Sequence, residues 1–137
     1  MTFVDTSALL AFLDRDAARH EEVVAISVEI FRERRAVTHN YVLIETEALA
    51  HRRLGAGVAR RLLEDVAPIL EIVWVDAELH EAAVTAHLRA LRRRSSLVDH
   101  VSFEFMRRRG MHSVLALDRD FGREGFDLVL SPSPSRT

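Results

Sequence analysis

Cysteine and lysine are both absent from the 137-residue sequence, so all 19 of its basic Lys+Arg positions are arginine. The lack of cysteine excludes a disulfide scaffold, thiolate catalysis and a cysteine-based zinc site. The lack of lysine excludes the phosphate-binding P-loop motif, Schiff-base chemistry and a lysine general base. The preference for arginine is better explained by a GC-rich genome or a hot habitat than by a function.

Long apolar runs are also missing, because charged residues interrupt every apolar stretch well short of a membrane span. No secretion signal is recognisable at the N-terminus. The composition, 48% hydrophobic and 29% charged with a net charge of −2, supports a folded core and is too apolar for a disordered chain. We therefore expect a cytoplasmic protein without membrane contact. It would have one domain over residues 1–130 and a disordered tail over residues 131–137.

Short apolar runs alternate with amphipathic stretches along the chain. Strands are expected at residues 3–4, 36–39, 69–75, 113–117 and 128–130. Helices are expected at residues 6–13, 18–35, 41–54, 58–66, 77–94 and 97–109. The run 69–75 is the strongest strand signal because it is β-branched and aromatic. In the helix 77–94, Val84, Leu88 and Leu91 form one apolar stripe.

The alternation of strands and helices predicts an α/β fold. Parallel strands need helical crossovers, which cover both faces of a mostly parallel central sheet and give a three-layer α/β/α sandwich. In such sheets ligands bind at the carboxyl ends of the strands, near the point where the strand order reverses. Functional side chains are therefore expected at this edge of the sheet.

Three aspartates stand at positions that suit either a site or a helix cap. Asp5 ends the first expected strand, and Asp118 follows the buried run 114–117, so both would lie at the carboxyl edge of the sheet. Either one could instead cap the helix that follows it. Asp99 lies three residues after Ser96, which is the spacing of a capping box.

Glu45 is harder to explain as a structural residue. It lies among Tyr41, Ile44 and Leu49 on a stripe that is predicted to face the core. A carboxylate there is costly unless it binds a metal or pairs with an arginine. Both alternatives stay open from the sequence.

Bringing these four acids together would concentrate negative charge, which destabilises a fold unless a cation neutralises it. An all-oxygen ligand set suits Mg²⁺ or Mn²⁺ and not zinc or copper. A divalent ion in such a site can activate a water for phosphodiester hydrolysis. The arginine runs 52–53, 60–61, 92–94 and 107–109 would suit a nucleic-acid backbone if they surround the acids, and are otherwise solvated helix ends.

Four segments, in order, resemble the motifs of the PIN-domain ribonucleases, in particular the VapC-type toxins of toxin–antitoxin pairs. The segments are VDTSALL (4–10), YVLIE (41–45), SLVD (96–99) and LDRDF (117–121). The resemblance extends from Phe3 to Leu130. It implies a Mg²⁺- or Mn²⁺-dependent endoribonuclease that acts on RNA phosphodiesters. It also implies an antitoxin protein that blocks the site, and a homodimer.

The resemblance also assigns roles to individual residues. Asp5, Glu45, Asp99 and Asp118 would be the catalytic acids and would hold the metal. Ser7 and Asp120 are candidate auxiliary residues.

One position departs from the family pattern, because Ala116 stands where a threonine or serine commonly precedes the fourth acid. This departure supports an alternative function, a catalytically impaired PIN-like module that binds RNA or protein. Receiver domains and haloacid-dehalogenase-type phosphatases also place acids at strand ends, but both use a lysine that this chain lacks.

Overall fold

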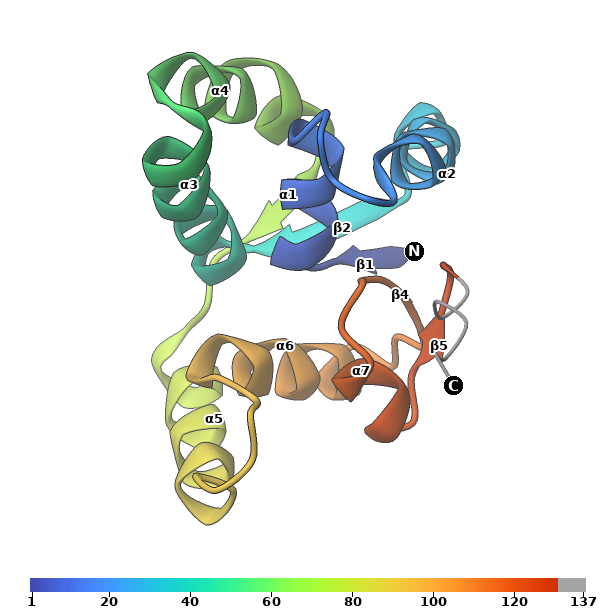
Figure 1. The fold of residues 1–137 in the computed structure, drawn as a ribbon. Helices are drawn as coiled ribbons and strands as arrows, with labels where there is room; N and C mark the ends of the chain where they lie inside the picture. The colour runs from blue at the N-terminus through green and yellow to red at the C-terminus, as the bar shows by residue number, and fades with distance from the viewer. Residues whose placement is uncertain (131–137) are drawn as a thin grey trace, which may run out of the picture.

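A computed structural model of the chain describes residues 1–130 and shows a five-stranded sheet with helices on both sides (Figure 1). The strands are β1 (Thr2–Val4), β2 (Ala36–His39), β3 (Glu71–Val73), β4 (Ser113–Leu115) and β5 (Asp127–Leu128). The helices are α1 (Thr6–Leu13), α2 (His20–Arg32), α3 (Asn40–Leu54), α4 (Ala56–Arg61), α5 (Ala77–Arg89), α6 (Leu97–Arg108) and α7 (Asp120–Arg123). A π-helical turn (Leu62–Val66) and a 3-10 turn (Ala67–Ile69) connect α4 to β3.

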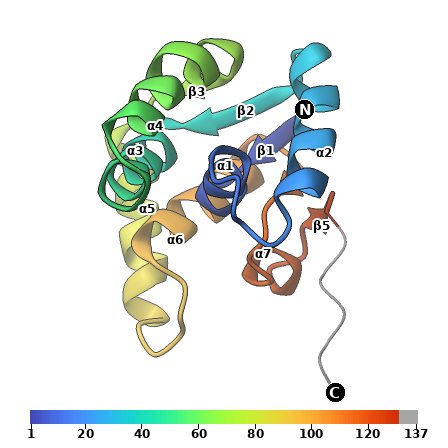
Figure 2. The ribbon, with the colours of Figure 1, turned by 45° about the horizontal axis from the view of Figure 1, so that its top comes forward.

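All five strands are parallel, in the order β3-β2-β1-β4-β5. The order reverses at β1, where Phe3 pairs with Val37 of β2 on one side and Val114 of β4 on the other. The sheet separates α1 to α4 from α5 to α7 (Figure 1), and α1 lies between α2 and α3 (Figures 1 and 2). The predicted α/β/α sandwich is confirmed, and its switch point lies between β1 and β4.

The core surrounds the three inner strands of the sheet, β2, β1 and β4. Phe3, Val37 and Val114 are fully buried. On one side of the sheet the rings of Phe103 and Phe121 meet at a centroid distance of 5.0 Å. Burying such large apolar side chains supplies most of the folding free energy and fixes the sheet between its helices.

Two details of the sequence interpretation are wrong. The strand predicted at residues 69–75 is limited to Glu71–Val73 and lies at the edge of the sheet, and Trp74 is 76% exposed. β-Branched and aromatic residues suit an edge strand as well as a central one, so composition could not distinguish the two.

The apolar stripe assigned to the helix 77–94 is also wrong. Leu88 and Leu91 are 61% and 60% exposed, whereas Leu79 and Ala83 are buried. The helix α5 ends at Arg89 and packs mainly on α6, so the apolar residues of its final turn extend beyond that contact.

The disordered tail predicted for residues 131–137 lies outside the described residues, and so does the domain boundary at residue 130. Within residues 1–130, no helix combines the length and hydropathy needed to cross a bilayer.

Candidate active site at the carboxyl edge of the sheet

Asp5 follows β1 directly and caps the N-terminus of α1. Its backbone N–H donates to the carbonyl of Leu115 at 3.0 Å, which holds it against the end of β4. Its carboxylate Oδ2 accepts from the Ser7 backbone N–H at 3.1 Å and from the Ser7 hydroxyl at 2.7 Å. Asp5 can therefore cap α1 and still belong to a functional site at the carboxyl edge of the sheet.

The Asp5 carboxyl is only 4% exposed, and burial raises its pKa to about 7. The hydrogen bonds from Ser7 oppose this rise, and the negative charge of Asp99 adds to it. Desolvation disfavours the charged form, so the buried acid holds its proton near neutral pH unless a cation replaces it. This places a titrating carboxyl at the switch point of the sheet.

Ser7 links Asp5 to the segment that carries Asp118. While its hydroxyl donates to Asp5, its Oγ accepts from the backbone N–H of Leu117 at 2.9 Å. The adjacent Ala116 is buried. The segment after β4 therefore has a hydroxyl partner, which Ser7 supplies in place of the hydroxyl that Ala116 lacks.

Asp99 forms the capping box that its spacing to Ser96 predicts. Its carboxylate Oδ2 accepts from the Ser96 backbone N–H at 2.8 Å, and the Ser96 hydroxyl accepts from the Asp99 backbone N–H at 3.1 Å. Burial raises the pKa of Asp99; the Ser96 N–H opposes this effect, and the charges of Asp118 and Glu45 add to it. The cap thus turns the carboxylate toward the other acids.

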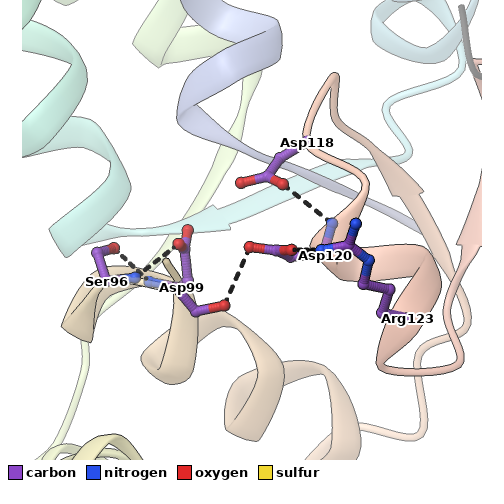
Figure 3. Close-up of polar contacts among 6 residues, drawn as sticks. Ser96, Asp99, Asp118, Asp120 and Arg123 are labelled. Carbon is purple, nitrogen blue, oxygen red and sulfur yellow. Dashed lines mark hydrogen bonds and ion pairs between the residues drawn. The ribbon is translucent and has the colours of Figure 1, made fainter. Parts of the chain in front are cut away.

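Asp99, Asp118 and Asp120 form a compact group in which one carboxylate oxygen from each lies within 4.8 Å of the others (Figure 3). Asp118 accepts from the backbone N–H of Asp120 at 2.9 Å. Asp120 is held by the Ser95 hydroxyl at 3.0 Å and by Arg123 at 3.0 Å. Asp120 is therefore a member of the acidic group, and its charge is partly compensated by Arg123.

Glu45 is half-buried on α3, and its charge acts on Asp99 across the gap between α3 and α6. The prediction that its stripe faces the core is wrong in part, because Ile44 is 62% exposed. The buried residues of this helix include Val42 and Thr46. Glu45 thus lies at the border of the packed face, near enough for its charge to act on Asp99 but outside the compact group of three aspartates that includes Asp99.

His39 supports the two helices that carry Glu45 and Asp99, and the sequence analysis missed it. Its ring is fully buried, and burial lowers its pKa to about 3, so it is neutral. Its Nδ1 accepts from the Val42 backbone N–H at 3.3 Å, which leaves the proton on Nε2 to donate to the Ser102 hydroxyl at 2.9 Å. That hydroxyl donates to the Val98 carbonyl at 3.1 Å.

This chain of hydrogen bonds joins the first turn of α3 to the first turns of α6. It fixes the helices that bear two of the acids relative to each other and to β2. The sequence offered one signal, a histidine between a β-branched run and a helix, which is where a buried polar side chain caps an element.

The arginine runs differ in their surroundings. In the run 107–109, Arg107 pairs with Glu124 at 2.6 Å. Arg108 lies 3.9 Å from Glu78, and Arg109 lies 3.7 Å from Glu71. This run is largely structural. Arg53 borders an apolar cavity of about 230 Å³ beside Ser7, and the run 92–94 borders a polar cavity beside Asp120.

The donor set fits a hard divalent cation. All the side chains involved offer carboxylate oxygens, the ligands that Mg²⁺ and Mn²⁺ prefer. The raised pKa values of Asp5 and Asp99 reflect the energetic cost of ionising these groups, which comes mainly from their burial and to a smaller extent from the negative charges beside them. A bound cation would remove that cost, whereas a purely structural arrangement would pair the acids with arginine, as happens at Asp120.

Comparison with known proteins gives a consistent result. The family model of the PIN domain matches residues 2–126. The chain is 34% identical over 128 residues to the 23S rRNA-specific endonuclease VapC20 of Mycobacterium tuberculosis. The aligned region covers 92% of this chain and 95% of VapC20.

The solved structures agree. The crystal structure of M. tuberculosis VapC20, described as a sarcin–ricin loop cleaving toxin, superimposes with a TM-score of 0.85 at 32% identity and covers 94% of this chain and 98% of the other. FitAcB from Neisseria gonorrhoeae superimposes with a TM-score of 0.69 at 14% identity, over 93% and 96% of the two chains, which is a likeness of fold alone.

Proposed function

The chain belongs to the PIN-domain family, and we propose that it is a divalent-metal-dependent endoribonuclease, the toxin of a toxin–antitoxin pair. The observation that carries this proposal is the group of Asp99, Asp118 and Asp120 at the carboxyl edge of the sheet, with Asp5 and Glu45 near enough to interact electrostatically with Asp99. The 34% identity to a 23S rRNA-specific endonuclease makes 23S rRNA the substrate that we propose for this chain.

In this proposal Asp5, Glu45, Asp99 and Asp118 hold Mg²⁺ or Mn²⁺ and are the catalytic acids. The ion, when bound, lowers the pKa of a water and stabilises the leaving oxygen of a phosphodiester. Asp5 would have to be ionised to hold the cation, and its burial would keep bulk water away from that side of the site. The cap at Ser96 keeps one oxygen of Asp99 engaged, so that the other remains for the cation.

Asp120 has an auxiliary role in the same proposal. Its carboxylate is already bound by Ser95 and Arg123, so it is a weaker ligand than Asp118. Its backbone N–H orients Asp118 at 2.9 Å. Asp120 therefore positions the fourth acid more than it replaces it.

The alternative, an impaired module that binds without cleaving, depends on Ala116. The Ser7 hydroxyl hydrogen-bonds the next residue, Leu117, and also Asp5, so the site retains a hydroxyl between its first and fourth acids. This contact favours the active enzyme.

We further propose the partners that such a toxin requires. A protein antitoxin would block the acidic site, and the protein would work as a homodimer. Its site of action would be the cytoplasm, where ribosomal RNA is found.

The direct test is cleavage of RNA with and without metal. We expect purified protein to cut 23S rRNA in Mg²⁺ or Mn²⁺ and to lose all cleavage in EDTA, with recovery when excess metal is restored. Fragments are mapped by primer extension. Cleavage that persists in EDTA, or intact RNA under all metal conditions, would contradict the proposal.

Removing the Ser7 hydroxyl should weaken the site without removing a ligand. The hydrogen bonds from Ser7 lower the pKa of Asp5, so Ser7→Ala should raise it further. The acidic limb of the pH–activity profile should then move to higher pH, and the apparent metal affinity should fall by about 10–100-fold, as for other residues that orient a ligand. Ser7→Thr keeps the hydroxyl and serves as the control; a pH profile shared by both variants would exclude this role.

A further inference from the structure

A polar cavity of about 510 Å³ lies beside the acidic group. Its wall consists of Arg92, Arg93, Arg94, Ser95, Asp120, Arg123 and Glu124. These residues come from the α5–α6 connection and from α7 with the residue after it. The cavity therefore combines four guanidinium groups with two carboxylates, and the pairing of these charges decides what it can bind.

Both carboxylates already have an arginine partner. Asp120 pairs with Arg123 at 3.0 Å, and Glu124 pairs with Arg107 at 2.6 Å. The run 92–94 has no carboxylate partner within residues 1–130, and all three of its residues are exposed. It differs in this respect from the run 107–109, whose arginines are matched with glutamates. The cavity thus carries an uncompensated positive charge.

The cavity shares Asp120 with the acidic group of the proposed catalytic centre. Asp120 contributes an oxygen to the acidic group while it forms part of the cavity wall, and Figure 3 shows it between Asp118 and Arg123. On the other wall, Ser95 donates to Asp120 and directly precedes the Ser96 cap that orients Asp99. A chain with a phosphate at the acids can therefore place its next phosphate among the arginines.

We propose that this cavity binds a backbone phosphate of the RNA, adjacent to the phosphodiester that is cut; this inference rests on the proposed function. Guanidinium groups are planar, weakly hydrated and well suited to paired hydrogen bonds with phosphate oxygens. Negative acids at the centre repel RNA, and the run 92–94 offsets that repulsion at the point where the strand enters or leaves. The contact supplies affinity and register and carries no base preference.

The test compares two triple variants that remove the same charge. Arg92, Arg93 and Arg94 are each changed to Gln in one variant. The control changes Arg32, Arg34 and Arg35 to Gln. These residues immediately precede β2, at the amino ends of the strands, whereas the acids lie at the carboxyl ends. Binding of a fluorescein-labelled single-stranded RNA is measured by anisotropy in EDTA, so that neither cleavage nor metal binding affects the result.

We expect the 92–94 variant to bind RNA at least tenfold more weakly than the control. Its plot of log affinity against log salt concentration should be shallower by about 0.7, since the loss of one phosphate contact to single-stranded nucleic acid removes about 0.7. The single variant Arg93→Gln should show a smaller change in the same direction. In cleavage assays KM should rise while kcat stays within about twofold.

Equal RNA affinity and equal salt slope for the two triple variants would overturn the inference. So would a fall in kcat with an unchanged KM, which would place these arginines in the chemistry or in folding. Both outcomes are separate from failure of the proposed function, which would appear as absence of metal-dependent cleavage by the unmodified protein.

Discussion

Changing Asp5 to Asn is expected to abolish RNA cleavage, with a loss of at least about 10²–10³-fold in kcat/KM, comparable to the removal of a central electrostatic group from an active site. The substitution preserves side-chain size and the hydrogen bond from the Ser7 backbone N–H. It removes the buried charge that the proposed cation requires. Single-turnover cleavage of 23S rRNA in Mn²⁺ measures the effect.

Asp127→Asn is the matched control for this experiment, because Asp127 is an exposed aspartate at the start of β5, away from the acids. It should retain full activity. The unfolding temperature of Asp5→Asn in EDTA should equal or exceed that of the unmodified protein, since a buried carboxyl no longer has to ionise. Loss of activity accompanied by loss of folding would instead indicate that the carboxylate is structural.

The second large effect is a pH-dependent loss of folding stability that is caused by ionisation of the Asp5 carboxyl. The pKa of Asp5 is raised from 3.8 to about 7 in the folded chain. The stability that this provides is fully present below about pH 3.8 and is lost as the pH rises to about 7, because the unfolded chain ionises first. The full cost is on the order of 4 kcal/mol, which corresponds to roughly 10 °C in unfolding temperature for a domain of this size.

Thermal unfolding in EDTA should therefore separate the unmodified protein from Asp5→Asn progressively between pH 4 and pH 7, with the variant more stable at the upper end. Titrating groups that do not interact with Asp5 are common to both proteins and cancel in the difference. Mn²⁺ added at pH 8 should raise the unfolding temperature of the unmodified protein and leave Asp5→Asn nearly unchanged, because the ion binds the ionised site. A difference that does not vary with pH would disprove this account.

The sequence predicted the layers of the fold because they depend on local signals. Alternating strands and helices, and glycine after α6 at Gly110 with φ of 62°, are readable from residue order alone. The order of strands within the sheet is a long-range property. The strongest strand signal, at residues 69–75, consequently belonged to a short edge strand, and the exposure of Leu88 could not be foreseen.

The sequence could propose residues for the candidate site but could not predict their contacts. Asp99 illustrates the limit, because its spacing predicted a helix cap, and the structure shows a cap that also faces the other acids. The links made by Ser7 to Leu117 and by His39 to Ser102 join positions 110 and 63 residues apart. No local pattern could reveal such partners.

The central position of β1 has a consequence for synthesis of the protein on the ribosome. Residues 2–4 acquire their neighbour β4 only after residues 113–115 have been made, and Asp118 is translated later still. Such distant pairings form slowly and late. A growing polypeptide therefore lacks the assembled group of Asp99, Asp118 and Asp120 until the segment that follows β4 has been made.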